Sequence, residues 1–416
     1  MKIFYKNILF HTHSITSLVC AIILLGYYLS STSIDEWNKS QSSAMRICRN
    51  NLKISDSIRG DLKQFYSRNN ATYNQIISDM DIRSVSIQDT IKPDHCLSGH
   101  EADVWYLGKN GIKWINDTPT VITGFADDVY EVQSSICDRS GDLLLYSDGN
   151  YIYNKFHERI ANIRNYSGSS SSMFLILPQP GNDSIYYVFH PQETTGSVND
   201  SLFDLFFTVI DIRANLGHCK VLNLGQLLLK TSSEKVTGVR HCNGRDWWII
   251  GLRAPDEAFH SWILSDTSIN VSNPIISYSG NINHLAFYDQ ENLGWLKPSH
   301  DGKFLIEVTS GSQLYSTLEI HKFNSTSGII TDGLQVLGQV DKFEELYSIE
   351  WSPNQQIIYV TGFNKSGGYD LFQMNVSKYD QNFIRSSLIN LASTPSNIGS
   401  PILGKDQKMY LTNYGT

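Results

Sequence analysis

One short unit, a polar turn followed by an apolar strand, recurs along this chain and constrains its fold more than any other feature. In the segment 138–154 (DRSGDLLLYSDGNYIYN), one polar turn precedes Leu143–Tyr146 and a second precedes Tyr151–Tyr153. Ser-Gly and Asp-Gly between short apolar or aromatic runs are strong hairpin signals, because Gly and Asn adopt the positive φ that such turns need. The segment therefore predicts two successive turns within one antiparallel sheet.

The same pattern returns at intervals of roughly fifty residues. The related segments are HCNGRDWWIIGL (241–252), SHDGKFLIEV (299–308), SPNQQIIYVTG (352–362) and GKDQKMYLTN (404–413). A chain with 12% aromatic and only 18% charged residues, divided into such short runs, favours antiparallel β-structure over helix. Repeated units of this length are typical of a radial array of sheets rather than of a single sandwich.

The positions of the turns divide the chain into units. Five of them are predicted to be complete, at Glu131–Ile163, Ser172–Lys230, Lys235–Gly280, Asn292–Gly338 and Glu345–Ser393. Three short strands precede them, at 103–108, 111–116 and 119–124, and Gly399–Asn413 adds two more after them. Joining the terminal strands would complete a sixth blade and remove exposed sheet edges. We therefore predict an all-β protein, a six-bladed β-propeller closed by its N- and C-terminal strands, with seven blades as the alternative.

The first 33 residues carry an export signal. An apolar run, Ile15–Leu29, follows two lysines and precedes two acidic residues. This charge asymmetry predicts that the N-terminus is cytoplasmic and that the rest of the chain lies outside. The run is short for a spanning helix, and small residues after it suit a signal peptidase. Residues 1–33 are thus a cleaved signal peptide, or an anchor that holds the chain in the membrane through residues 14–30.

Residues 34–100 differ from the repeated region that follows. Between Arg46 and Met80, apolar residues recur at mixed three- and four-residue spacing, which predicts a short helical segment near the membrane. The propeller is expected to span residues 101–416. The net charge of −8, with Lys and Arg scattered singly, excludes the nucleic-acid-binding class, which needs a clustered basic face. The expected location is extracytoplasmic, either anchored at the cell envelope or secreted.

The cysteines of the exported part are odd in number, so at least one thiol is expected to be unpaired. Candidate disulfides join neighbours in the sequence, Cys48 with Cys96 and Cys219 with Cys242. In the alternative interpretation, some of these cysteines are small buried apolar residues.

The motifs of the repeated region, taken in order, resemble a family of bacterial cell-surface β-propellers. These motifs are VWYLGKNGIKW, SSICDRSGDLLLYSDGNYIYNKFHE, MFLILPQPGNDSIYYVF, SSEKVTGVRHCNGRDWWII, GWLKPSHDGKFL and IEWSPNQQIIYVT, within residues 103–413. The family is found mainly in Bacteroidota, often ahead of PKD repeats and a gliding-motility or type IX secretion domain. The resemblance implies a WD40-like or lactonase-like propeller at the cell surface. The stretch 34–100 and the end of the sequence at Thr416, without PKD repeat or sorting domain, depart from the family pattern.

No catalytic motif is recognised in the sequence, and no cofactor is expected. The cluster from His95 to His100 has conceivable metal spacing but lacks a nearby fourth ligand, so no metal site is predicted there. Binding residues are predicted at the mouth of the central channel, where the first strands of all blades converge. The candidates are Glu131, Glu234, Lys235, Arg240 and His241. In the alternative, the glutamates only cap and solvate the wet channel.

Paired aromatic residues offer a second kind of candidate. In Trp247-Trp248 and Tyr186-Tyr187 the two side chains point to opposite faces of a strand. Core packing is the expected role of both, and a stacking platform for sugar is the alternative for one of each pair.

Three functional hypotheses follow. The favoured one is a non-enzymatic exported propeller that binds a protein or glycan at the cell envelope or surface. The alternative is a lactonase-like or other hydrolase that acts in the central channel, which requires converging carboxylates and histidine. A membrane-anchored sensor that relays a signal through residues 34–100 is the third.

Overall fold

The structure, a computed structural model, describes residues 99–126, 134–163, 174–193, 203–280, 293–310, 316–338, 343–364, 366–395 and 398–413. All of these belong to Lys92–Thr416, the second of two units into which the chain divides. The predicted signal or anchor, nearly all of the helical segment 34–100, and the candidates Glu131, Cys48 and Cys96 lie outside the described residues. Among the described helices, none has the length and apolar character needed to cross a membrane.

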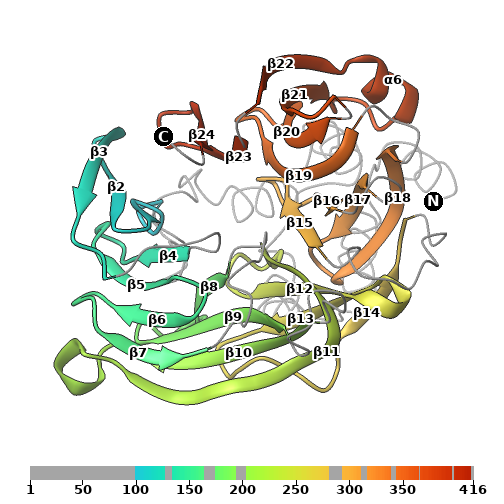
Figure 1. The fold of residues 1–416 in the computed structure, drawn as a ribbon. Helices are drawn as coiled ribbons and strands as arrows, with labels where there is room; N and C mark the ends of the chain where they lie inside the picture. The colour runs from blue at the N-terminus through green and yellow to red at the C-terminus, as the bar shows by residue number, and fades with distance from the viewer. Residues whose placement is uncertain are drawn as a thin grey trace, which may run out of the picture. The chain divides into compact units, whose positions relative to one another are not determined.

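The described part is built from antiparallel sheets of consecutive strands (Figure 1). The first sheet contains β1 (Val104–Leu107), β2 (Asn110–Ile115) and β3 (Thr118–Thr123). The second contains β4 (Ser134–Cys137), β5 (Leu143–Ser147), β6 (Tyr151–Asn154) and β7 (Arg159–Asn162).

A seven-stranded sheet follows. Its strands are β8 (Leu175–Pro178), β9 (Ile185–Glu193), β10 (Phe203–Asp211), β11 (Lys220–Arg240), β12 (Trp247–Arg253), β13 (Ala258–Leu264) and β14 (Ile275–Tyr278). Two short 3-10 helices, Ala214–Gly217 and Ala254–Asp256, lie in its connections.

The remaining strands form three more sheets. The first contains β15 (Leu293–Pro298), β16 (Phe304–Ser310), β17 (Thr317–Asn324) and β18 (Ile329–Leu337). The next contains β19 (Phe343–Trp351), β20 (Ile357–Asn364), β21 (Tyr369–Asn375) and β22 (Ile389–Thr394), and a two-stranded sheet contains β23 (Ile398–Leu403) and β24 (Met409–Asn413). The helix α6 (Gln381–Ser386) joins β21 to β22, and the Asp380 side chain caps it by accepting a hydrogen bond from the Phe383 N–H.

The strand β11 explains why one sheet has seven strands. Residues 220–232 of β11 pair with β10, and residues 236–240 pair with β12. Between these halves the register is broken, and Thr231 has a φ of 53°. The chain thus passes from the last strand of one four-stranded group, β8–β11, to the first strand of the next, β11–β14, without leaving the ladder (Figure 1).

The repeated polar motifs are the turns between the first and second strands of successive sheets. Residues 138–142, 241–246, 299–303, 352–356 and 404–408 all occupy this position. In the first of them, the Asp138 carboxylate accepts hydrogen bonds from the backbone N–H groups of Ser140 and Asp142. Gly141 has a φ of 85°, and a Cβ there would lie 2.6 Å from the Asp103 carboxylate. The prediction of these turns from Gly, Asp and Asn is confirmed.

The hydrophobic core lies between successive groups of strands. Between the β11–β14 group and the next sheet, Trp248, Ile250 and Phe259 pack with Leu305 and Phe323. Four other buried clusters fill the corresponding spaces between β1–β3 and β4–β7, between β4–β7 and β8–β10, between the two halves of the seven-stranded sheet, and between the β15 and β19 sheets. Each group therefore packs face to face with the next.

The first strands of successive groups also touch in order. The strand β4 contacts β8, β11 contacts β15, β15 contacts β19, and β19 contacts β23. First strands that meet in sequence, with a core between each pair of groups, define a β-propeller arrangement. The predicted all-β propeller class is confirmed, and four sheets with four or more strands are present in the described residues.

The terminal sheets contact one another. The Lys405 ammonium, in the β23–β24 turn, pairs with the carboxylate of Asp103, just before β1. The Tyr410 ring in β24 lies edge-on to Trp105 and Trp114, with ring centroids 5.7 and 5.5 Å apart. These contacts bring strands from the two ends of the described region together.

Candidate functional site

The described residues enclose a cleft of about 470 Å³ where turns of the second and third sheets meet. In an antiparallel sheet, the first and third turns lie at the same end, so 138–142, 179–184 and 212–219 gather there. We call this hollow the loop cleft. Its lining includes Glu101, Cys137, Asp138, Arg139, Leu144, Lys155, Pro178, Gln179, Asn182, Asp183, Tyr186, Ile212, Arg213, Cys219, Arg240 and Trp247. Ligand sites commonly have volumes of roughly 300–1,000 Å³, a range that includes this one.

The wall of the loop cleft is apolar and contains two thiols. Cys137 ends β4, Cys219 precedes β11, and both are buried and unpaired. Burial raises the pKa of Cys137 to about 12 and that of Cys219 to about 11, so both thiols stay protonated near neutral pH. Burial also raises the pKa of the neighbouring Tyr186 to about 12, which keeps its phenol neutral. These groups do not act as nucleophiles near neutral pH and instead form part of the wall of the loop cleft.

The rim of the loop cleft carries charges of both signs. Arg139, Lys155 and Arg213 are exposed, and so is Asp183. The Arg213 guanidinium lies 3.7 Å from the Asp183 carboxylate, and the Lys155 ammonium lies 5.2 Å from the centre of the Phe156 ring. A polar rim around an apolar wall is the usual anatomy of a binding surface.

Arg240 joins the loop cleft to the turn that follows β11. Its guanidinium stacks on Trp247, 3.6 Å from the ring centroid, and donates a hydrogen bond of 2.7 Å to the Arg245 carbonyl oxygen. Trp247 is 6% exposed, and its Nε1 is buried without a hydrogen-bond partner in the described structure. This stacking holds Arg240 at the edge of the cleft.

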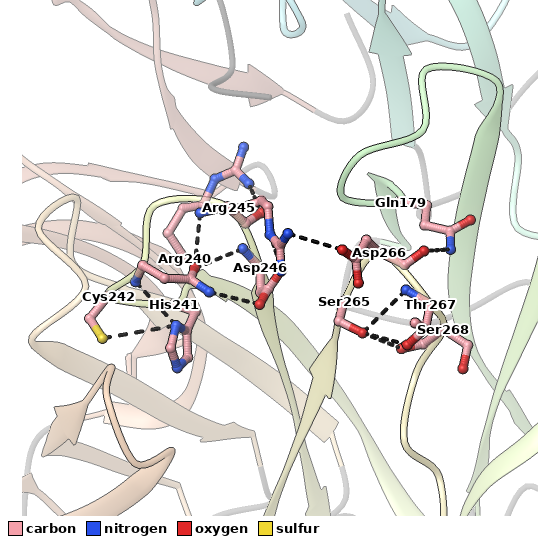
Figure 2. A network of polar contacts seen from close by, with 11 residues as sticks. Gln179, Arg240, His241, Cys242, Arg245, Asp246, Ser265, Asp266, Thr267 and Ser268 are labelled. Carbon is pink, nitrogen blue, oxygen red and sulfur yellow. Dashed lines mark hydrogen bonds and ion pairs between the residues drawn. The ribbon is translucent and has the colours of Figure 1, made fainter. Parts of the chain in front are cut away.

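A polar network ties the neighbouring turns together (Figure 2). Arg245 forms ion pairs with Asp246 at 3.0 Å and with Asp266 at 2.9 Å. The Gln179 side-chain amide donates to the Asp266 carbonyl oxygen at 2.8 Å. The turns after β8, β11 and β13 are thereby linked, which fixes this side of the cleft.

The predicted residues Arg240 and His241 lie at this end of the sheet. Arg240 lines the loop cleft, whereas His241 does not. The His241 Nδ1 accepts a hydrogen bond of 3.1 Å from the Asn243 N–H and so belongs to its own turn. Glu131 lies outside the described residues.

Glu234 and Lys235 lie apart from Arg240 on the same strand. They begin the inner half of β11, six residues before Arg240, which is about 20 Å of extended chain. Glu234 is 0% exposed, and its carboxylate accepts a hydrogen bond of 2.7 Å from the Gly294 N–H in β15. Both residues are buried against the neighbouring sheet, and their role at the mouth of a central channel stays a prediction.

The Lys235 ammonium is held by the β15–β18 sheet. It donates to the Glu307 carboxylate at 2.8 Å and to the Thr309 hydroxyl at 2.7 Å. His321 lies 3.5 Å from Glu307 and 3.9 Å from Glu319. Burial acts to raise the pKa of Glu307, but Lys235 and His321 outweigh it and hold that pKa far below its ordinary value. The cluster is an ionic contact between two groups of strands.

The suggested disulfide between Cys219 and Cys242 is not formed. Cys219 is buried in the core between the second and third sheets, and its thiol faces the carbonyl oxygens of Ile212 and Gly217. Cys242 is exposed in the β11–β12 turn. The alternative of a small buried thiol describes Cys219.

The aromatic pairs have the expected core role. Trp247, Trp248, Tyr186 and Tyr187 are all less than 9% exposed, so none presents an open face to solvent. Of the His95–His100 cluster, the structure describes only Gly99 and His100, and His100 bonds Asp103 at 2.7 Å. Within the described ranges, no group of three or more His, Cys, Asp or Glu could hold a metal ion.

The sequence reasoning missed Lys155, Arg213 and the turn 179–184. They belong to different strand connections, and only the packing of the second sheet against the third brings them together. A usable signal was present in the sequence, since each lies in a first or third turn, and such turns share one end of a sheet.

No family model and no curated protein matches this chain. Among solved structures, a Bacteroides uniformis protein assigned as a candidate 6-phosphogluconolactonase is 11% identical, with a TM-score of 0.43, over 73% of this chain and 83% of that one. The Cps50 (Swd1) β-propeller domain of Myceliophteria thermophila is 9% identical, with a TM-score of 0.42, over 77% and 95%. The Pseudomonas aeruginosa periplasmic gluconolactonase PpgL is 12% identical, with a TM-score of 0.39, over 65% and 71%. These likenesses concern the fold alone.

Proposed function

We propose that this chain is a non-enzymatic propeller of the cell envelope or surface, which binds a protein or glycan in the loop cleft. The observation that carries the proposal is the cleft itself, in which turns from two sheets and the stacked Arg240 surround an apolar wall. Turns held by a rigid sheet scaffold are where binding proteins commonly place their ligand contacts.

We further propose that the propeller has six blades and is closed by its terminal strands. The two halves of β11 count as the last strand of one blade and the first of the next. With the sheets β4–β7, β15–β18 and β19–β22 this makes five four-stranded blades. The terminal strands, which meet through Lys405 and Asp103 and through Tyr410, would supply the sixth.

The proposed location rests on the sequence. The charge asymmetry around Ile15–Leu29 supports export, with residues 1–33 as signal peptide or anchor and 34–100 as a membrane-proximal helical segment. The order of the six motifs supports membership of the Bacteroidota-type surface-propeller family. Its expected partners are therefore molecules of the envelope or the cell exterior.

The hydrolase hypothesis requires carboxylates and histidine that converge on an accessible channel. The described residues do bring Glu307, Glu319 and His321 together, but their side chains are only 12%, 7% and 0% exposed. A substrate cannot reach a cluster that is packed between two sheets, so this arrangement favours binding over hydrolysis.

The binding proposal is tested with the full-length chain in detergent, used as bait for solubilised envelope extract and on a glycan array. Arg213→Glu reverses an exposed charge on the cleft rim, and Lys322→Glu is the matched control on the β15–β18 sheet. We expect the wild type and Lys322→Glu to retain a ligand that Arg213→Glu loses. Retention of nothing by the wild type, or equal retention by all three, would contradict the proposal.

A further inference from the structure

Several side-chain acceptors of the loop cleft already accept hydrogen bonds from the chain itself. The Asp138 carboxylate accepts two backbone N–H groups of its own turn, and the Asn182 side-chain oxygen accepts the N–H and hydroxyl of Ser184. The Glu101 carboxylate accepts the Gly99 N–H. Asp183 faces the Arg213 guanidinium. A ligand that brings donors would therefore compete with these bonds.

Two donors of the same cleft have no acceptor among the described residues. Lys155 forms no ion pair or hydrogen bond with the described residues, and its ammonium lies 5.2 Å from the centre of the Phe156 ring. The Tyr186 hydroxyl, a neutral donor that lines the cleft, makes no hydrogen bond there either. Because unpaired donors in a partly dry site favour an acceptor, the complementary ligand is rich in oxygen acceptors.

The charge of the lining residues also favours a ligand rich in oxygen acceptors. The loop cleft carries four basic residues, Arg139, Lys155, Arg213 and Arg240, against three acidic ones, whereas the whole chain has a net charge of −8. The net charge of the residues that line the cleft is therefore positive, opposite in sign to the net charge of the chain. Complementary charge steers association and suppresses partners of the wrong sign.

The wall distinguishes a peptide from a sugar. Sugar sites offer an open aromatic face, but the Trp247 face is covered by Arg240 and Tyr186 is only 7% exposed. The wall instead presents aliphatic surface from Leu144, Pro178 and Ile212. Such a surface buries apolar side chains, and the rim cations can pair with carboxylates beside them.

We propose that the loop cleft binds an acidic peptide segment of a partner protein, with its apolar side chains on the wall and its carboxylates on Lys155, Arg213 and Arg240. This inference rests on the proposed binding function and specifies its ligand.

The test uses fluorescence polarisation with the full-length chain in detergent. The probes are a short labelled peptide of alternating Glu and Leu and its counterpart in which Gln replaces every Glu. We expect the Glu peptide to bind at least about tenfold more tightly than the Gln peptide, with an advantage that shrinks at high salt. Equal binding of the two peptides would overturn the inference.

Two matched variants localise the effect. Lys155→Glu reverses an exposed charge in the cleft, and Lys303→Glu reverses one on the β15–β16 turn, which does not line it. We expect about a tenfold weaker Glu-peptide affinity for Lys155→Glu and an unchanged affinity for Lys303→Glu. An equal loss in both variants would overturn the inference. Binding of a glycan that depends on Arg213, together with no binding of the Glu peptide, would also overturn the inference. The proposed function would stand in that case. Absence of any ligand would remove both.

Discussion

The two ends of the inner half of β11 carry similar residues in opposite surroundings. At its beginning, Glu234 and Lys235 are fully buried and bonded to the β15–β18 sheet. At its end, Arg240 is half-buried, stacked on Trp247 and open to the loop cleft. One end therefore uses its charges to join two groups of strands, and the other holds a charged side chain at the edge of the loop cleft. Charged residues on one strand thus have different roles, because Glu234 and Lys235 are bonded to the β15–β18 sheet, whereas Arg240 stacks on Trp247 beside the loop cleft.

The largest expected effect concerns the buried end. Lys235→Met removes the main cation that compensates Glu307 and leaves its carboxylate buried without that partner. Breaking one side of a buried ion pair typically costs about 3–5 kcal/mol, and we expect a loss of unfolding free energy in that range by chemical denaturation. The double variant Lys235→Met with Glu307→Gln should recover much of it. A loss below about 1 kcal/mol in Lys235→Met would mean that the pair is not the contact described here.

The pH dependence of the unfolding free energy tests the same ion pair between Lys235 and Glu307. The pKa of Glu307 is lowered in the folded chain, so its contribution to stability is complete above its ordinary value of 4.5 and is lost as the pH falls below that value. The free-energy difference between wild type and Glu307→Gln should therefore narrow in acid, by up to about 1.4 kcal/mol per pH unit. Chemical denaturation curves of both proteins, recorded from pH 7 to acidic pH, measure this difference in unfolding free energy. A difference that stays constant would contradict the lowered pKa.

Glu234→Ala is expected to have a smaller effect. It removes the buried hydrogen bond from the Gly294 N–H to the Glu234 carboxylate, which costs about 1–3 kcal/mol. Glu234→Gln should cost less, since its amide oxygen can still accept. Gly294 itself is needed at this position, because its φ is 126° and a Cβ there would meet the Val308 carbonyl oxygen at 2.0 Å. Equal stability of the Ala and Gln variants would show that this hydrogen bond contributes little.

The smallest effect on stability is expected at the other end of the strand. Arg240→Ala removes a partly exposed cation from the Trp247 ring, worth about 0.5–1 kcal/mol. Its effect on ligand retention should be larger, because Arg240 lies in the cleft. Denaturation and envelope pull-down on the same preparation separate the two readouts. A large loss of stability with unchanged retention would reverse the roles assigned to the two ends.

The fold was predictable because turn chemistry is local. Asp138, Gly141 and their counterparts specify the first turn of each sheet through their own backbone bonds, so their positions follow from the sequence. The continuity of β11 was not predictable in the same way. Thr231-Ser232-Ser233 looks like a turn between units, and in the structure it is a break in register inside one ladder.

The candidate site was predictable only in part, because it depends on contacts between sheets. Arg240 was identified from its position at the end of a first strand. The burial of Glu234 and Lys235 does not follow from the sequence, because their partners Gly294 and Glu307 lie on the next sheet. Lys155 and Arg213 belong to turns that no local pattern connects.

The assignment of ligand binding to one end of β11 is tested most directly by amide hydrogen exchange of the full-length chain, with and without the Glu-Leu peptide. We predict slower exchange in the turns 138–142, 179–184 and 212–219 when the peptide is bound, and unchanged exchange at 232–237 and 305–309. Slower amide exchange at 232–237, or unchanged exchange in the three turns at saturating peptide, would contradict this assignment.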